Sequence, residues 1–312
     1  MTINEINANE RILMPFLNRS IMDSVRLTFD MCGSSKPQEP DFVAVLSLNF
    51  PRDLFNILRA LFPAYKLSVT GVFCHQKPIV DIDESNAPEI GDLLLVFRER
   101  FFHFPDRLNS LLLQAKVTSS QTLAIKSNEK HQLRLYKEWP EFTYKRAGLL
   151  NGVKRDILPK TINNGAKYLL IDTDPVRNGL LGIPGTFPIG CAIANDTLML
   201  DSNLADEIFN FLKFKTGRAF EQRHTHLKDD WSKMIWDLLE IARLSTFTRR
   251  NAGFVKTPRT NEYVYFSTNE SNSDMPFENL FGNDHFVGEN CVEYEGEGVS
   301  VILIESEPMD MG

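Results

Sequence analysis

Hydrophobic residues near the start of the chain recur at helical spacing. The recurring residues are Leu13, Phe16, Leu17, Ile21 and Val25, and their spacing predicts a helix over residues 8–31. The segment that follows, GSSKPQEP, is rich in Gly, Ser and Pro and predicts a loop.

Two further elements are expected before residue 63. The run DFVAVLSLNF (41–50) contains many β-branched and aromatic residues, so it predicts a strand. Pro51 suits the first turn of a helix and predicts one over RDLFNILRALF (52–62).

From Lys66 onward, short apolar runs bounded by polar loops replace the helical pattern, and their length is typical of buried strands. Predicted strands are KLSVTGVFC (66–74), KPIVDI (77–82), GDLLLVF (91–97), SLLLQAKV (110–117), AKYLLID (166–172) and EGVSVILIESE (297–307). Helical patterns return over 202–214 and, after the capping pair Asp229-Asp230, up to about residue 247. This alternation predicts an α/β protein with a mixed sheet flanked by helices.

The runs 91–97 and 110–117 are joined by about a dozen residues, so a hairpin is the simplest arrangement. If Phe97 pairs near Leu111, Asp92 lies opposite Lys116. Gln114 and Lys116 are two residues apart, so both side chains leave the same face of the strand. Three polar groups then meet at one end of two apolar strands, where burial is costly unless they are satisfied. The alternative is a strand whose polar end simply reaches solvent.

A bound cation would satisfy these groups. Carboxylate and amide oxygens are hard ligands that suit Mg²⁺ or Mn²⁺. Such an ion polarises a phosphoryl oxygen and acidifies a bound water, and an adjacent lysine offsets the developing negative charge. The hairpin therefore predicts phosphodiester hydrolysis, with Asp92, Gln114 and Lys116 as the reactive residues.

EIGDLLLVF followed by SLLLQAKV resembles the core of the PD-(D/E)XK nuclease superfamily, in the branch that has Gln in place of the second acid. The resemblance implies a Mg²⁺- or Mn²⁺-dependent endonuclease that cleaves DNA. Asp92, Gln114 and the backbone carbonyl of Ala115 would bind the metal, and Lys116 would assist the reaction. A helix carboxylate often joins such sites, and Glu10 in ANERILMPFL is the first candidate, with Glu39 second.

The resemblance covers roughly residues 8–145 and implies a restriction-endonuclease-like fold. We expect this core in residues 1–160, an α/β extension packed on it in 161–259, and an acidic C-terminal segment with a late strand in 260–312. Similar nucleases serve bacterial restriction or antiphage defence. Because two cuts in a duplex commonly need two active sites, a homodimer or a partner protein of a defence system is expected.

The segment 116–160 is basic, with ten Lys and Arg against four acids, a net charge of +6 (10 − 4). Tyr136, Trp139 and Tyr144 are interleaved with these cations, which suits phosphate contacts and base stacking. An ordinary solvated helix face with inward aromatic rings is an equal alternative. The expected nucleic-acid contacts are Lys126, Lys130, Arg134, Lys137, Lys145 and Arg146. Gln132 is a further candidate for the site.

The net charge of −7 conceals an asymmetry. No Lys or Arg follows Arg259, whereas twelve acids do, so the rest of the chain carries 34 basic and 29 acidic residues (41 − 12). The overall acidity therefore does not argue against a polyanionic partner for the body. The acidic segment is solvated surface, a shield over the basic groove, or a docking site for a basic partner. Its polar part, 260–284, is expected to be mobile.

Other features of the sequence are less informative. The four cysteines form no Cys-x-x-Cys pair, the N-terminus does not resemble a signal peptide, and no apolar run approaches the roughly 20 residues of a membrane span. We therefore expect a cytoplasmic protein without membrane contact. His224-x-His226 and GLLGIPG (179–185) are interpreted as loops.

Two alternatives to an active nuclease remain open at this point. An inactive module of nuclease-like fold would bind nucleic acid or a partner protein. An effector would respond to a small molecule or partner through the region after residue 161.

Overall fold

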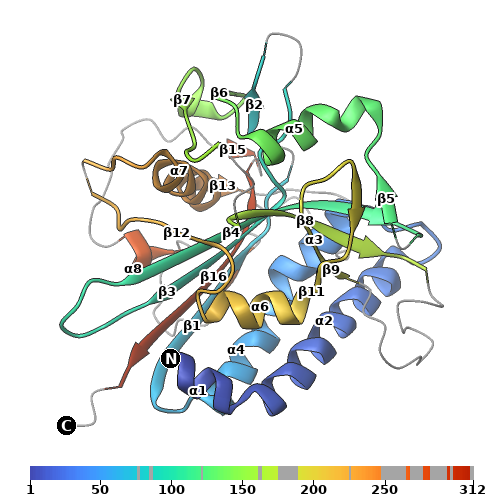
Figure 1. Ribbon diagram of the computed structural model, residues 1–312. Coiled ribbons are helices and arrows are strands. Elements are labelled where there is room, and N and C mark those ends of the chain that lie inside the picture. The colour runs from blue at the N-terminus through green and yellow to red at the C-terminus, as the bar shows by residue number, and fades with distance from the viewer. Residues whose placement is uncertain are drawn as a thin grey trace.

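The computed structural model describes the chain except residues 76–77, 84–86, 121, 161–163, 175–188, 225, 247–264, 268–276, 282–293, 296–297 and 310–312. Its main element is a mixed sheet. The strands are β1 (Tyr65–Val72), β3 (Leu93–Glu99), β4 (Arg107–Thr118), β8 (Ala166–Asp172), β9 (Ile189–Ala192), β11 (Ser202–Asn203), β12 (Arg218–Ala219), β14 (Tyr265–Ser267) and β16 (Ser300–Pro308). Within the described residues they follow the order β11-β9-β8-β4-β3-β16-β1-β14, with β12 beside β4 (Figure 1). The expected mixed α/β sheet is confirmed.

The last strand, β16, is an internal strand of this sheet. β16 is parallel to β3 on one side and antiparallel to β1 on the other. β8 and β9 continue the same sheet beyond β4. One sheet therefore crosses both boundaries expected at residues 160 and 260.

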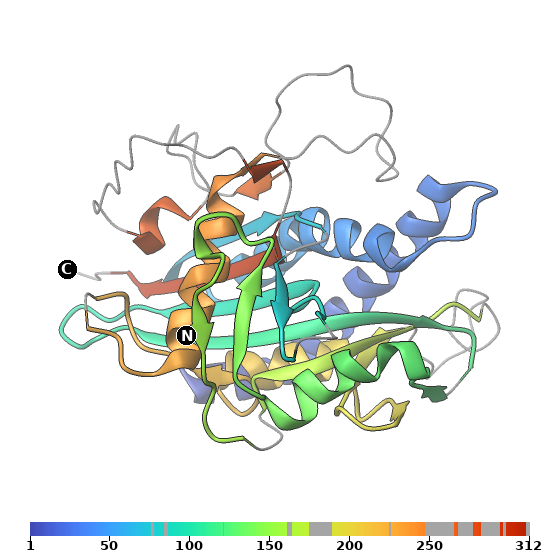
Figure 2. The ribbon, with the colours of Figure 1, turned by 90° about the horizontal axis from the view of Figure 1, so that it is seen from above.

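Helices cover both faces of the sheet. One face carries α1 (Ile3–Ala8), α2 (Glu10–Cys32), α3 (Glu39–Leu48), α4 (Phe50–Leu61) and α6 (Leu204–Leu212). The other carries α5 (Lys130–Glu138), α7 (Asp230–Leu244) and a small sheet of β2 (Ile79–Asp81), β6 (Phe142–Lys145) and β7 (Lys154–Arg155), all in front of the main sheet in Figure 2. Short elements complete the described fold: β5 (Thr122–Ala124), η1 (Ser127–Glu129), η2 (Gly148–Leu150), β10 (Thr197–Met199), β13 (Ser245–Thr246), α8 (Glu278–Phe281) and β15 (Tyr294–Glu295).

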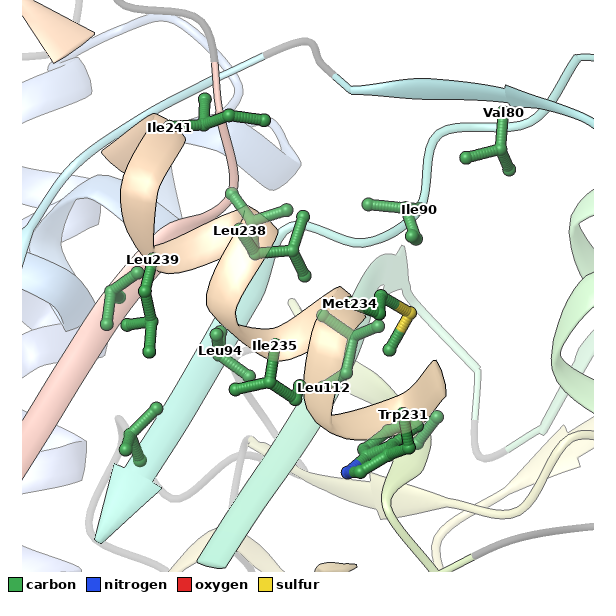
Figure 3. Close-up of a cluster of buried hydrophobic side chains, with 14 of the residues drawn as sticks. Val80, Ile90, Leu94, Leu112, Trp231, Met234, Ile235, Leu238, Leu239 and Ile241 are labelled. Atoms are coloured by element: carbon green, nitrogen blue, oxygen red, sulfur yellow. The ribbon is translucent and has the colours of Figure 1, made fainter. Parts of the chain in front are cut away.

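Strand alternation divides the core between the two faces. Leu93, Leu95 and Leu111 pack with the first group of helices. Leu94 and Leu112 pack with the second group, where α7 contributes an apolar stripe that includes Trp231, Met234, Ile235 and Leu238 (Figure 3). Both sides of the hairpin are therefore buried, which explains its unbroken hydrophobic sequence.

The strand expected over 41–50 is wrong, because residues 41–48 belong to α3 and Phe50 begins α4. Every residue from Phe42 to Ser47 is buried, and a run that is apolar on all sides does not distinguish a strand from a buried helix. The helix begins where the backbone N–H of Gln38 donates to the Asp41 carboxylate at 2.8 Å. Gly71 of β1 lets α3 approach closely, since a Cβ there would lie 1.9 Å from the Ser47 carbonyl oxygen.

The hairpin forms as expected, but with a different register. Leu95 pairs with Leu111 and Leu93 with Leu113, so Asp92 lies opposite Gln114 rather than Lys116. The strands extend to Glu99 and Arg107, which shortens the loop. Because the register differs by two residues, Asp92, Gln114 and Lys116 still share one face.

No described helix is long and apolar enough to cross a membrane. Cys32, Cys74 and Cys191 are free thiols, whereas Cys291 lies outside the described residues. The segment GLLGIPG also lies outside them, as does most of 260–284.

Candidate functional site

A cleft of about 840 Å³ opens where β3 begins and β4 ends, between the first turn of α3 and the start of α5. Asp92, Gln114 and Lys116 all line it, so the structure brings together the three residues predicted from the hairpin. The remaining lining residues that bear charge or an amide are Lys36, Gln38, Glu39, His75, Glu89, Glu129, His131 and Gln132.

Backbone pairing fixes the position of Asp92. Its N–H donates to the Leu113 carbonyl at 2.9 Å, and its carbonyl accepts from the Ser300 N–H at 3.0 Å. Neighbouring strands therefore hold the residue on both sides. This leaves the carboxylate directed at the end of β4.

The carboxylate of Asp92 is bound by the opposite strand. Its Oδ2 accepts hydrogen bonds from the Gln114 side-chain Nε2 and, at 2.7 Å, from the backbone N–H of Ala115. In this arrangement Gln114 Oε1 is buried and has no hydrogen-bond partner among the described residues. A buried acceptor without a donor is costly, so this atom is well suited to a cation or a donor from a ligand.

Lys116 is held by a different acid. Its Nζ donates to Glu129 Oε1 at 2.6 Å, while Glu39 Oε1 accepts from the Val117 backbone N–H at 3.3 Å. Burial disfavours the ammonium charge, but Glu39, Glu129 and Asp92 outweigh it and raise the Lys116 pKa. The lysine is therefore charged at neutral pH.

The cleft contains more negative than positive charge. The pKa of Asp92 is raised from 3.8 to about 7, chiefly by burial and also by the charges of Glu89 and Glu39, while the Ala115 N–H and Lys116 act to lower it. Burial likewise raises the Glu89 pKa. Four acids face two lysines, a formal net charge of −2 (2 − 4) when all are ionised. This balance favours cation binding.

Glu10 does not join the cleft. It is exposed at the first turn of α2, and that helix has 23 residues. At about 1.5 Å per residue, Glu10 lies roughly 33 Å along the axis from the end that leads to α3. The helix carboxylate in the cleft is Glu39, the second candidate, from the first turn of α3.

Sequence reasoning missed Glu89 and Glu129 as cleft residues. Glu89 lies three residues before Asp92 and pairs with Ile79 through an isolated β-bridge. Glu129 ends η1, directly before α5. Glu89 belongs to the quoted EIGDLLLVF run, so its place beside Asp92 was the available signal, whereas Glu129 depends on the docking of α5.

The aromatic residues of the basic segment do not form a stacking surface. Tyr136, Trp139 and Tyr144 are at most 1% exposed and belong to the core. Their rings pack together or on neighbouring core rings, so the alternative of inward aromatic residues is correct. Hydrophobic burial outweighs an exposed stacking role here.

The predicted phosphate-binding cations fall into two groups. Arg134 pairs with Asp83 and Glu138, Lys137 with Asp196, and Lys145 with Asp81. The other three are Lys126, Lys130 and Arg146, which are exposed and have no ion pair with the described residues. The ion pairs of the first group reduce the charge that it offers to a polyanion.

Histidine and carboxylate side chains alone do not form a metal site in this arrangement. Among the described residues, no three His, Cys, Asp or Glu side chains lie close enough together to hold an ion. His224 and His226 are exposed, and neither lines the cleft. A metal in the cleft therefore needs the Gln114 amide as well as carboxylates.

Comparison of the chain with protein-family models, with curated proteins and with solved structures gave no match. The fold is a mixed α/β sheet flanked by helices. What the protein does is inferred from the chemistry of the cleft.

Proposed function

We propose that the protein is a metal-dependent nuclease that hydrolyses DNA phosphodiester bonds in this cleft. The observation that carries the proposal is the unpartnered, buried Gln114 Oε1 beside Asp92 in a cleft with an excess of carboxylates. A hard cation would give that oxygen a partner and reduce the repulsion among Glu39, Glu89 and Asp92. We further propose that the sheet is a restriction-endonuclease-like core.

The donor set fits Mg²⁺ or Mn²⁺. Asp92 and Gln114 would hold the ion, with Glu39 and the Ala115 carbonyl as further ligands. Because Nε2 now faces Asp92, the Gln114 amide would turn so that Oε1 lies beside Asp92 and gains the ion as its partner. When bound, such an ion would polarise a phosphoryl oxygen and lower the pKa of a water.

The other cleft residues contribute charge and orientation. Lys116 would offset negative charge on the phosphate, because its ammonium is positive at neutral pH and borders the same cleft. To do so it must leave Glu129, which now accepts its hydrogen bond. Gln132 Nε2, buried without a hydrogen-bond partner among the described residues, is available to donate to a phosphate oxygen.

The test is cleavage by purified protein. Plasmid, linear and single-stranded DNA are incubated with Mg²⁺ or Mn²⁺ and wild type, Lys116→Ala or Lys228→Ala. Lys228 is an exposed lysine outside the basic segment 116–160 that does not line the cleft, so it controls for loss of surface charge. We expect wild type and Lys228→Ala to cleave and Lys116→Ala to lose at least about 100-fold in rate. Equal behaviour of wild type and Lys116→Ala under every condition contradicts the proposal.

A second candidate is a binding module of the same fold without activity. It is favoured by the engaged state of the polar groups, since Asp92 Oδ2 already has two donors and Lys116 is paired with Glu129. Calorimetry with Mn²⁺ separates the two functions. A nuclease should release or absorb heat that Asp92→Ala abolishes, and a metal-free module should not.

The resemblance to restriction nucleases also suggests a place in bacterial restriction or antiphage defence, with a second copy or a partner protein completing a double-strand cut. Phage plating on cells that express wild type or Lys116→Ala tests this role. Protection that depends on Lys116 is the expected result. Equal plating on both strains contradicts a nuclease role in defence.

A further inference from the structure

The start of α5 differs from the rest of the basic segment in how its cations are paired. Lys130 and His131 form no ion pair with any of the described residues. Arg134 and Lys137, on the same helix, do form ion pairs. Lys130 is exposed and His131 is half-buried. Positive charge is therefore available at the end of α5 that borders the cleft.

A second cavity adjoins the first at this point. It has a volume of about 280 Å³ and is lined by Ile82, Ser127, Asn128, Lys130, His131 and Arg134. His131 lines both this cavity and the cleft of Asp92, so the two spaces share a wall. Because His131 lines both spaces, the second cavity lies beside the cleft that contains Asp92.

The residues at the junction can bind an oxyanion. Lys130 supplies charge, and Ser127 and Asn128 are hydroxyl and amide donors beside it. Gln132, on the cleft side of the junction, is 6% exposed, and its Nε2 has no hydrogen-bond partner among the described residues. A buried donor in this state indicates that a ligand oxygen completes the wall.

We propose that the second cavity, with Lys130 as its principal cation, is a phosphate subsite that binds the nucleic-acid backbone next to the bond that is cut. The proposal rests on the proposed function for its choice of polymer. It commits to a phosphate of a strand, because the cavity lies beside the cleft in which the strand would be cut, with His131 lining both. A free phosphate or mononucleotide shares the same chemistry and is distinguished below.

Binding of a fluorescent single-stranded oligodeoxynucleotide to the full chain tests the subsite. Anisotropy is measured in Ca²⁺ at several salt concentrations, and a gel confirms that the probe stays intact. The variants are Lys130→Gln, Lys130→Arg and Lys228→Gln. Lys228 provides the control for loss of one surface charge, since it is exposed, lies outside the basic segment 116–160 and lines neither cavity.

We expect Lys130→Gln to weaken binding by about 3- to 10-fold and to lower the slope of log K against log salt by about one contact. Lys130→Arg should restore binding, and Lys228→Gln should stay within about twofold of wild type. Equal affinities for Lys130→Gln and Lys228→Gln overturn the subsite. The subsite is also overturned if Lys130→Gln binds the oligonucleotide as wild type does and loses affinity only for inorganic phosphate or a deoxynucleoside monophosphate.

Failure of this subsite is separate from failure of the nuclease proposal. Cleavage by wild type with no effect of Lys130→Gln on binding or rate would overturn the subsite alone. A Lys130-dependent loss of binding in a protein that cleaves nothing would support the subsite and contradict hydrolysis.

Discussion

Asp92 is unusual because its surroundings oppose its charge. Burial, together with the charges of Glu89 and Glu39, raises its pKa from 3.8 to about 7. The folded state therefore holds a proton on Asp92 at pH values where the unfolded chain has released it. The contribution of Asp92 to the free energy of unfolding is fully present below about pH 4 and is lost as the pH rises from about 4 toward 7.

Asp92→Asn removes the charge while keeping an oxygen that accepts the Ala115 N–H. Without divalent metal, we expect this variant to be more stable than wild type by about 1–3 kcal/mol at pH 8. The difference should shrink toward zero near pH 4. Urea unfolding at both pH values measures it. A variant that is less stable at pH 8 than wild type contradicts the charge state assigned to Asp92.

Glu39 and Glu10 provide a matched pair for the helix carboxylate, since each lies in the first turn of its helix but only Glu39 lines the cleft. We expect Glu39→Gln to weaken Mn²⁺ binding by about 10- to 100-fold. Glu10→Gln should leave it unchanged. Calorimetry measures both affinities, and equal effects of the two substitutions would show that Glu39 is not a ligand.

The elements of the site were easier to predict than their register. The sequence predicts both strands of the hairpin, and polar residues that interrupt an apolar run at a strand end are a clear signal. Leu93 to Phe97 and Leu111 to Leu113 are apolar on both faces, however, so their pattern does not fix which residues pair. The error of two residues preserved the face and hence the site.

Elements whose role depends on tertiary packing could not be predicted in this way. Residues 42–47 are all buried, so the helical periodicity is lost and the run 41–50 predicts a strand instead of α3. Glu129 reaches Lys116 only because α5 docks on the sheet. Glu10 ranks above Glu39 in the sequence because it lies near the start of a predicted helix, whereas Glu39 lies in a predicted loop before a predicted strand.

Docking of α5 depends on Tyr136, whose hydroxyl donates to the Ile90 carbonyl at 2.9 Å, two residues before Asp92. Tyr136→Phe leaves that carbonyl without this donor, so we expect a loss of about 1–2 kcal/mol in the free energy of unfolding. Tyr168 is the control, since its buried hydroxyl has no hydrogen-bond partner among the described residues. Tyr168→Phe should be neutral or stabilising. A larger cost for Tyr168→Phe than for Tyr136→Phe contradicts this assignment.

At the scale of the molecule, distant parts of the chain form one sheet, and the strand β16 joins them. It pairs with β3 along 300–306 and with β1 along 301–308. Two of the acids that follow Arg259 also serve this sheet, since Glu305 pairs with Arg98 and Glu307 with Arg100. The C-terminal acidity is thus partly structural, which composition alone does not reveal.

Truncation after residue 298 removes β16, so β3 and β1 each lose the strand that pairs with them on that side. We expect the shortened chain to lose its cooperative thermal transition, because two ladders and the buried Val301, Ile302 and Leu303 are lost together. Circular dichroism on heating measures the transition. A sharp transition close to that of the full chain would mean that β16 is not central.

The most direct test of the metal site is a crystal structure with Mn²⁺, located by its anomalous scattering. We predict one ion in the cleft, about 2.0–2.2 Å from an Asp92 oxygen and from Gln114 Oε1, with Lys116 released from Glu129. Crystals that bind Mn²⁺ elsewhere or not at all, with Gln114 Nε2 still donating to Asp92, would contradict the account.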